Sequence, residues 1–262
     1  MDSLQFTLTT LVCKNYIVEG FLEEDFTRLP RPYYTLCYVQ RGRITCTLGE
    51  REVVGKAGDV VFFPFHLKYI LRWCGEPDTS VYSIHFLLPP MADPFTGKEV
   101  PLQRLSGKGM EKEFEYILRH HKDREQSFYV LSLFYGLCHR IYTRLQYAES
   151  LPRDERIRKA VEYINLHAAE PLTVETLAAL CFMSPSRFFY CFKKETGQTP
   201  IEYKNHLCIR RGAALLLVDP HRSVEQISSE VGFSSATYFR RLFKHTYDYT
   251  PREYRKAMRS DF

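Results

Sequence analysis

The feature that most constrains this chain is an internal repeat near its C-terminal end. Residues 184–193 read SPSRFFYCFK and residues 235–244 read SATYFRRLFK, so the two segments align at a constant offset of 51. The dipeptides Thr-Pro and Glu-Tyr recur downstream at the same offset, whereas Leu177 and Ile227 match upstream at an offset of 50. Because chance rarely produces agreement at so many points, we infer that one supersecondary unit occurs twice.

Each copy predicts a short helix with one buried and one exposed face. Ser235 is a suitable N-cap for the second copy. Its apolar stripe, at helical spacing, consists of Tyr238, Phe239, Leu242 and Phe243. The opposite face carries a hydroxyl and three cations and consists of Thr237, Arg240, Arg241 and Lys244. A DNA major groove admits such a helix, although in a single copy the pattern also describes the solvated face of an ordinary surface helix.

The distribution of charge favours the nucleic-acid interpretation. Residues 1–150 contain 18 Lys and Arg against 18 Asp and Glu, whereas residues 151–262 contain 18 against 13. The basic excess therefore lies entirely in the half of the chain that carries the repeat. A basic excess confined to one region is typical of a region that binds a polyanion.

The cysteines and the N-terminus predict a cytoplasmic location. Eight cysteines occur without any C-x-x-C pair, and several lie inside apolar patterns, as expected of reduced and buried thiols. The N-terminal residues MDSLQFTLTT lack the basic and then apolar order of a signal peptide. The longest apolar runs, such as residues 60–65, are too short to cross a bilayer. We therefore expect a soluble protein with no membrane partner.

Residues 4–88 predict an antiparallel barrel or double-sheet roll. Short β-branched and aromatic runs follow one another at regular spacing and are separated by glycine turns. The expected strands include residues 33–38, 44–48, 52–54, 60–63, 69–73 and 81–88. Residues 58–64, GDVVFFP, resemble the second motif of cupin barrels, in which a Gly-Asp turn leads into a buried strand that ends in proline.

The histidines predict that this barrel binds no metal. Metal-binding cupins use an early His-x-His pair and a later histidine, but the first histidine of this chain is His66, and Lys68 stands near the later position. A metal needs three or four converging ligands, so we expect a metal-free pocket without a cofactor. Polar or aromatic tips that we expect to point into it belong to Arg28, Tyr38, Arg43, Lys68, Tyr82 and His85. A shift of one residue in strand register would turn these side chains outward.

Two helices and a domain boundary follow the barrel. Residues 111–122 and 126–148 read as helices, and the second has an apolar band wider than a single core-facing stripe. We expect one part of this band to cover the barrel, and the other to face a second subunit or another part of the same chain. Residues 149–154, with Pro152, predict the boundary between domains 1–150 and 151–262. The predicted fold class is therefore α+β, with a barrel and helices followed by an all-α domain.

The last 100 or so residues resemble the double helix-turn-helix domain of AraC/XylS-type transcription regulators. The motifs that carry this resemblance include Leu177-Ala178, Ser184-Pro185-Ser186-Arg187, Thr199-Pro200-x-Glu202-Tyr203, Val231-Gly232-Phe233-Ser234 and Thr250-Pro251-x-Glu253-Tyr254-Arg255. The first half is similar to the cupin-type sensor and dimerisation domain of the arabinose-responsive branch, through Gly42 and residues 58–64. Asp248 replaces the usual glycine after the second recognition helix, and Gly212 replaces an alanine of the linker helix.

The resemblance implies which residues contact DNA, because the second helix of each unit enters the major groove in this family. In the first unit the matched positions are Ser186, Arg187, Phe189, Tyr190 and Lys193. In the second unit they are Thr237, Arg240, Arg241 and Lys244. Arginine can pair with guanine O6 and N7 and Phe189 can contact a thymine methyl group, whereas the lysines at the far ends suit phosphates.

We therefore expect a ligand-responsive, sequence-specific transcription regulator that is not an enzyme. By resemblance it would be an activator, act as a homodimer, contact RNA polymerase and bind a small molecule in its barrel, with a sugar as the candidate class. The sequence contains no paired carboxylates, Ser-His-Asp arrangement or phosphate loop that would indicate catalysis. The alternatives are a metal-dependent cupin enzyme fused to a DNA-binding module, and a ligand-independent regulator whose barrel contacts other proteins.

Overall fold

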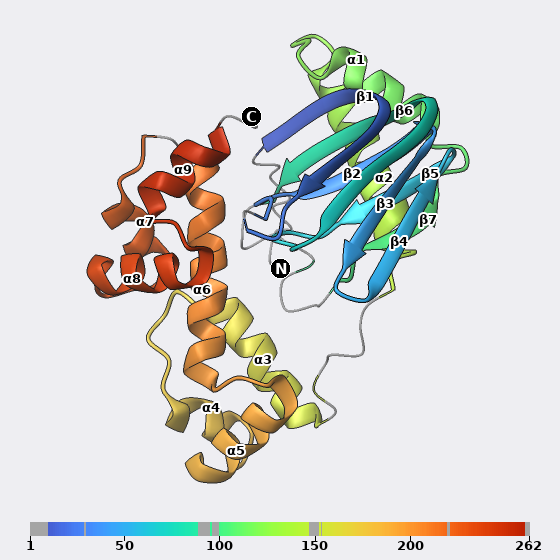
Figure 1. The fold of residues 1–262 in the computed structure, drawn as a ribbon. Coiled ribbons are helices and arrows are strands. Elements are labelled where there is room, and N and C mark those ends of the chain that lie inside the picture. The colour runs from blue at the N-terminus through green and yellow to red at the C-terminus, as the bar shows by residue number, and fades with distance from the viewer. Residues whose placement is uncertain are drawn as a thin grey trace. The chain divides into compact units, whose positions relative to one another are not determined.

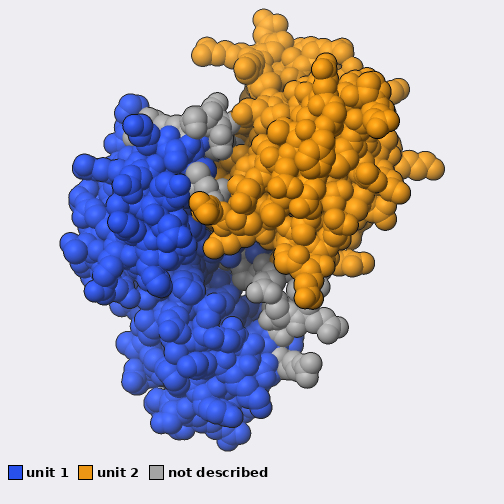
Figure 2. Space-filling model, viewed as in Figure 1, with its two compact units in different colours: residues 1–5, 89–99, 147–262 blue, residues 6–88, 100–146 orange. Residues whose placement is uncertain are grey.

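The chain forms two compact units (Figure 2). The computed structural model describes residues 10–28, 30–88, 95, 100–146, 152, 154–218 and 221–259. One unit comprises residues 6–88 and 100–146, and the other comprises residues 147–262 with residues 1–5 and 89–99. The domain boundary predicted at residue 150 falls outside the described residues, so it stays a prediction.

The first unit is an antiparallel sheet that rolls into a nearly closed barrel (Figure 1). Its strands are β1 (Thr10–Asp25), β2 (Tyr34–Arg41), β3 (Arg43–Leu48), β4 (Arg51–Lys56), β5 (Asp59–Phe63), β6 (Ile70–Leu87) and β7 (Gln103–Ser106). The strand order is β4-β3-β6-β2-β5-β7, and β1 pairs with β6 outside this path. The expected barrel is therefore confirmed.

Strand β6 is longer than its sequence pattern suggests. Two strands were expected at residues 69–73 and 81–88, but β6 is continuous and pairs with β3 through its first half and with β2 through its second half. Along its whole length β6 also pairs with β1, with one register shift after Glu19. Gly75 permits the change of partner, because a Cβ at this position would lie 2.1 Å from the carbonyl oxygen of Asp78.

The two faces of the sheet bury different sets of side chains. Inside the barrel, alternate residues of β2 such as Cys37 and Val39 pack with Val81 and Trp73 in one apolar cluster. The outer face of β2 and β6 is covered by α1 (Glu111–His120) and α2 (Ser127–Tyr142) (Figure 1). The rings of Phe86 and Phe134, on β6 and α2, lie 5.1 Å apart. Period-two alternation therefore fixes which residues face the interior.

Helix α2 ends earlier than predicted, and the chain after it forms hydrogen bonds with a side chain of β7. A helix was expected to residue 148, but α2 ends at Tyr142. The Gln103 side chain of β7 accepts the backbone N–H of Gln146 (2.8 Å) and donates to its carbonyl oxygen (3.0 Å). Strand β7 itself was not predicted, since four residues are too few to show an alternation.

The second unit consists of helices. These are α3 (Glu155–His167), α4 (Val174–Leu180), α5 (Pro185–Thr196), α6 (Pro200–Val218), α7 (Val224–Glu230), α8 (Ala236–Tyr247) and α9 (Pro251–Arg259). Figure 1 shows α4 and α5 at one end of the long helix α6, and α7 and α8 at its other end. The two helix-turn-helix units predicted from the repeat are therefore present, with α6 between them.

The sequence repeat is also a repeat of packing geometry. In the first helix-turn-helix unit, formed by α4 and α5, the ring centroids of Phe188 and Phe192 lie 5.5 Å apart, and Tyr203 of α6 meets Phe192 edge-on at 5.8 Å. The aromatic residues 51 positions later repeat both contacts, at 5.5 Å and 5.2 Å. Each helix-turn-helix unit is thus built on the same aromatic anchor, and this anchor orients the opposite face of its second helix towards solvent.

The ends of the second helices also match in chemistry. The side chains of Ser184 and Ser235 accept backbone N–H groups at the starts of α5 and α8, which confirms both as N-caps. At the C-terminal ends, Gly197 has a φ of 74° and Asp248 a φ of 59°. Aspartate visits the left-handed region more readily than most residues, so Asp248 serves in place of the usual glycine.

Candidate nucleic-acid interface and barrel interior

The predicted DNA-contacting residues of the first helix-turn-helix unit share the solvent-facing side of α5. All are exposed, and they are Ser186, Arg187, Phe189, Tyr190 and Lys193. Two of them are aromatic, and 41% of Phe189 and 66% of Tyr190 remain exposed. This face can offer apolar contacts and a hydroxyl along its middle, with cations near its two ends.

The second helix-turn-helix unit presents a more cationic face on α8. Thr237, Arg241 and Lys244 are exposed, whereas Arg240 is half-buried. The guanidinium of Arg240 forms an ion pair with Glu225, in the first turn of α7. The four predicted residues therefore do share one face, but Arg240 is bound to a carboxylate of the same unit, which the sequence pattern did not indicate.

Arg241 has a different neighbour within the same helix. Its guanidinium carbon lies 5.2 Å from the ring centroid of Tyr238, within the range of a cation–π contact. The Tyr238 hydroxyl accepts a hydrogen bond from Asn205 of α6 at 3.3 Å. Sequence reasoning assigned Tyr238 to the buried stripe, but 38% of it is exposed. Its spacing of three residues from Arg241 is the signal that could have identified this contact.

His85 lies inside the barrel among several hydroxyl groups. His85 of β6 is buried, and its Nδ1 lies 2.8 Å from the Thr35 hydroxyl. Its Nε2 lies 3.3 Å from the Ser83 hydroxyl and 3.4 Å from the Tyr16 hydroxyl. Burial lowers the pKa of His85 well below its ordinary value of 6.5, and the nearby cations of Arg31 and Lys14 lower it further. His85 is therefore neutral at physiological pH.

Arg31 brings a charged group to the same interior. Its guanidinium carbon lies 4.0 Å from the ring centroid of Phe26, and its Nη2 lies 3.6 Å from a carboxylate oxygen of Glu24. Glu24 also accepts the indole N–H of Trp73 at 2.8 Å. The Nε of Arg31 is buried and finds no hydrogen-bond partner among the described residues. A guanidinium, a carboxylate and aromatic rings therefore lie close together in the barrel interior.

Sequence reasoning missed most of this cluster. Of the six predicted pocket residues, His85 belongs to it, but Tyr16, Glu24, Arg31 and Trp73 were not singled out. The inward alternation of Thr35 and Tyr33 leads back along the chain to Arg31, and this is the signal that could have found it.

The prediction that Tyr38 and Tyr82 point into the barrel is wrong. Tyr38 packs on Phe114 of α1, with ring centroids 5.5 Å apart, and stacks on Tyr82 at 6.5 Å. Both therefore lie on the outer face, one residue out of register with the inward set. The remaining three predicted side chains, Arg28, Arg43 and Lys68, are exposed.

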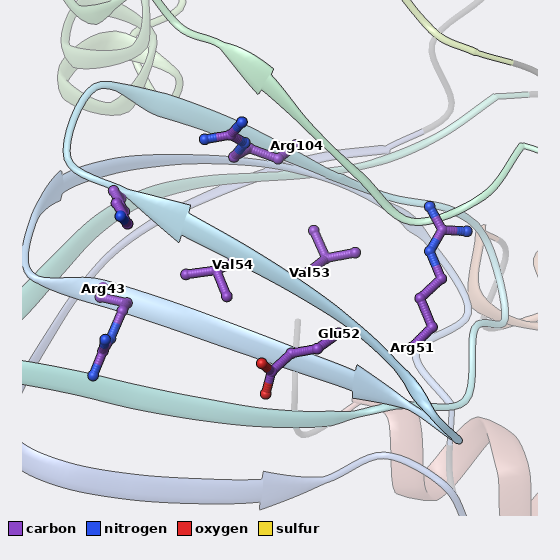
Figure 3. A pocket seen from close by; sticks show the side chains of 7 residues that line it. Arg43, Arg51, Glu52, Val53, Val54 and Arg104 are labelled. Atoms are coloured by element: carbon purple, nitrogen blue, oxygen red, sulfur yellow. The ribbon is translucent and has the colours of Figure 1, made fainter.

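Arg43 instead lines a depression on the barrel surface, with a volume of about 550 Å³. The depression lies at the two edge strands β4 and β7, and its cations are Arg43, Arg51, Lys56 and Arg104. Figure 3 shows the labelled arginines spread around its rim, where they do not converge on a single point. Arg104 also pairs with Asp59 at 3.5 Å. Cations along edge strands discourage the addition of another strand, which explains this surface without a ligand.

In the part of the chain that the structure describes, no group of three or more His, Cys, Asp or Glu residues is placed to hold a metal ion. Among the same residues, no helix combines the length and the apolar character needed to cross a bilayer.

Comparison with known proteins decides the nature of the helical unit. Residues 177–257 match the family model described as a helix-turn-helix domain. The regulatory protein PocR of Salmonella typhimurium is 33% identical over 109 residues, which are 41% of this chain and 35% of PocR. Residues 177–257 form an AraC-type double helix-turn-helix domain.

Other curated relatives also match part of the chain. The bifunctional transcriptional activator and DNA repair enzyme AdaA of Bacillus subtilis is 32% identical over 113 residues, which are 43% of this chain and 53% of AdaA. The match thus spans about a third to a half of these relatives. It falls on the AraC-type domain and not on the barrel.

Solved structures extend the likeness to both units. ToxT from Vibrio cholerae, crystallised with an unsaturated fatty acid, has a TM-score of 0.52 and 15% sequence identity, with 94% of each chain covered. A second ToxT structure, bound to (E)-4-(8-methylnaphthalen-1-yl)but-3-enoic acid, has a TM-score of 0.54 and 13% identity. At this identity the likeness concerns the fold, in which an N-terminal barrel precedes the AraC-type domain.

Proposed function

We propose that this protein is a transcription regulator that binds DNA sequence-specifically through α5 and α8. The observation that carries the proposal is the twofold occurrence of one aromatic-anchored helix-turn-helix unit, with a solvent-facing helix in each copy. PocR is named as a regulatory protein and AdaA as a transcriptional activator, which is in keeping with this proposal. We propose that the protein acts as an activator, with RNA polymerase as its further partner.

The two recognition helices are proposed to read DNA differently. Arg241 and Arg240 suit guanine, because a guanidinium can donate to O6 and N7 together. Phe189 and Tyr190 offer apolar surface for thymine methyl groups, and Lys193 and Lys244 suit phosphates. Helix α6, with 19 residues, is about 28 Å long. This length is comparable with the ~34 Å between successive major grooves on one side of DNA.

The barrel is proposed to bind the effector at the cluster around Arg31 and His85. A sugar fits this chemistry, since its hydroxyls can pair with Glu24 and Arg31 while its C–H face packs on Trp73. The fatty acid named for ToxT gives a competing ligand class, in which a carboxylate would pair with Arg31. The regulator is proposed to have no catalytic activity, because its similarity to AdaA is confined to the AraC-type domain.

The regulator is further proposed to act as a homodimer through α2. This helix buries Val130 and Phe134, and Phe134 packs on Phe86 of the barrel. At its N-terminal end 87% of Phe128 and 53% of Tyr129 remain exposed. A second copy would bury them, so light scattering should give a dimer mass for the wild type and a larger monomer fraction for Phe128→Ser.

A selection from random DNA tests the proposed function. The full chain should enrich duplexes that share one motif of two half-sites, and its affinity for them should fall steeply as salt is raised. Recovery of unrelated sequences with equal affinity would contradict the proposal.

Thermal shift measurements test the effector site. A monosaccharide panel and a carboxylic-acid panel are compared on the wild type, Arg31→Met and the exposed control Arg28→Met. A ligand should raise the melting temperature of the wild type and of Arg28→Met, but not of Arg31→Met. The responding panel identifies the ligand class, and an equal response from all three proteins would place the effector elsewhere.

A further inference from the structure

We propose that Glu225 is a positioning residue for DNA reading, which holds the Arg240 guanidinium so that α8 selects a guanine at one base pair. The inference rests on the proposed function, since it assigns a role within the proposed DNA interface of the second helix-turn-helix unit. It concerns a residue outside the recognition helix that the repeat and the family resemblance left unassigned.

The contact joins two helices of one unit. Nη2 of Arg240 donates to a carboxylate oxygen of Glu225. The Glu225 side chain is 60% exposed and that of Arg240 is 40% exposed. Ion pairs this close to solvent contribute little to stability. The main consequence of the contact is therefore the orientation of a long side chain that would otherwise sample many rotamers.

The support for Glu225 is rigid. A capping box fixes the first turn of α7. The Ser223 hydroxyl accepts the backbone N–H of Gln226 at 3.0 Å, and the Gln226 side chain accepts the backbone N–H of Ser223 at 2.9 Å. Val224 and Ile227, on either side of Glu225, are buried. The carboxylate is itself stabilised by its own backbone N–H and by Arg240, which together lower the pKa of Glu225. The backbone that carries Glu225 is therefore fixed, and its carboxylate is an anion beside Arg240.

The charge of the pair favours base reading over phosphate binding. A guanidinium has several N–H donors in a planar fork, so one can be bound by Glu225 while others remain for guanine O6 and N7. The pair as a whole is neutral, and its carboxylate would be repelled by a DNA phosphate. Arg240 paired in this way should add sequence discrimination and little non-specific affinity.

The first helix-turn-helix unit provides an internal control. Glu175 stands 50 residues before Glu225, in the first turn of α4. Phe189 stands 51 residues before Arg240 on the matched face of α5. A phenyl ring cannot form an ion pair, so Glu175 has no such partner at this position. Glu175→Gln therefore removes the equivalent charge without removing an equivalent contact.

The test measures binding of purified full-length variants to the selected operator, to operators with single base-pair changes under α8, and to unrelated DNA. For Glu225→Gln, discrimination at one base pair should fall by about 2-fold to 5-fold, because an exposed ion pair can orient Arg240 by no more than about 1 kcal/mol. Its affinity for unrelated DNA should stay equal or rise, because a negative charge has been removed. Glu175→Gln should keep the wild-type base preferences, and unchanged melting curves would show that both variants are folded.

The double variant separates positioning from direct contact. In an Arg240→Ala background, Glu225→Gln should cause no further loss of discrimination, because residues that act as a unit are not additive. An equal loss in both backgrounds would mean that Glu225 contacts a base by itself and would overturn the proposal. Unchanged discrimination in Glu225→Gln would also overturn it. A wild type without any sequence preference would instead contradict the proposed function and the inference with it.

Discussion

Gly212 of α6 lies directly against the ring of Phe239 of α8. A Cβ at Gly212 would lie 2.8 Å from Cε2 of this ring and 2.9 Å from Cζ. Phe239 is fully buried and packs on Phe243, which in turn meets Tyr254 edge-on. The glycine weakens the interior of α6 by about 1 kcal/mol relative to alanine, but it allows the linker helix and the second recognition helix to approach closely.

Gly212→Ala should therefore destabilise the protein in spite of its better helix propensity. Displacing a packed ring typically costs about 1–3 kcal/mol, which exceeds the gain of about 1 kcal/mol in propensity. Gly136 of α2 is the matched control, because a Cβ there meets no described atom within 4 Å. In urea unfolding, Gly136→Ala should be neutral or stabilising. Equal stabilisation by both variants would refute the packing account.

Phe182→Gly should stabilise the first helix-turn-helix unit. Phe182, in the turn between α4 and α5, has a φ of 53° and is 94% exposed. Left-handed backbone costs an L-residue about 1–2 kcal/mol, and an exposed ring returns little packing energy. The corresponding residue of the second helix-turn-helix unit is already a glycine, Gly232, with a φ of 93°. Thermal melting should show a higher transition for Phe182→Gly, and a lower one would mean that its ring makes stabilising contacts.

The barrel should lose stability as the pH falls below about 6.5. The pKa of His85 is lower in the folded than in the unfolded chain, so the unfolded state binds more protons in this range. The stability that neutral His85 provides is therefore complete above pH 6.5 and lost below it, with a slope of at most about 1.4 kcal/mol per pH unit. Urea unfolding between pH 5 and 7 should show this slope for the exposed control His139→Gln but a smaller one for His85→Gln. Equal slopes would contradict the assignment.

Arg241→Ala and Lys244→Ala should weaken DNA binding in different ways. Loss of Arg241 should relax specificity at one base pair, by about 1–3 kcal/mol. Loss of Lys244 should weaken all sequences similarly and reduce the salt dependence by about one phosphate contact. Titrations of operator and variant duplexes at several salt concentrations separate the two effects. If Arg241→Ala changed neither quantity, Arg241 would not be a reader.

The helical unit could be predicted closely from sequence because its information is local. N-caps, the left-handed position at Asp248 and the aromatic anchors recur at a fixed offset, and each depends on residues within one or two turns. The Arg240–Glu225 pair could not be predicted in this way, because it joins two helices across 15 residues. The place of Gly212 opposite Phe239 likewise depends on tertiary packing.

The barrel was harder to predict because its side-chain directions depend on register. The strands of β2, β3 and β5 were located well, but Tyr38 and Tyr82 were assigned to the wrong face, since a shift of one residue reverses every side chain. The interior group around His85 is assembled from β1, β2, β6 and the segment before β2. Its members are distant in sequence, and only the pairing of long strands brings them together.

Hydroxyl-radical footprinting of the full chain on its selected operator tests the central claim most directly. Two helix-turn-helix units held by α6 should protect two windows for each bound copy, with centres about 10–10.5 bp apart on one side of the duplex. Arg241→Ala should weaken protection in one of these windows only. A single protected window for each copy, or uniform protection along the duplex, would contradict the claim that α5 and α8 both enter the major groove.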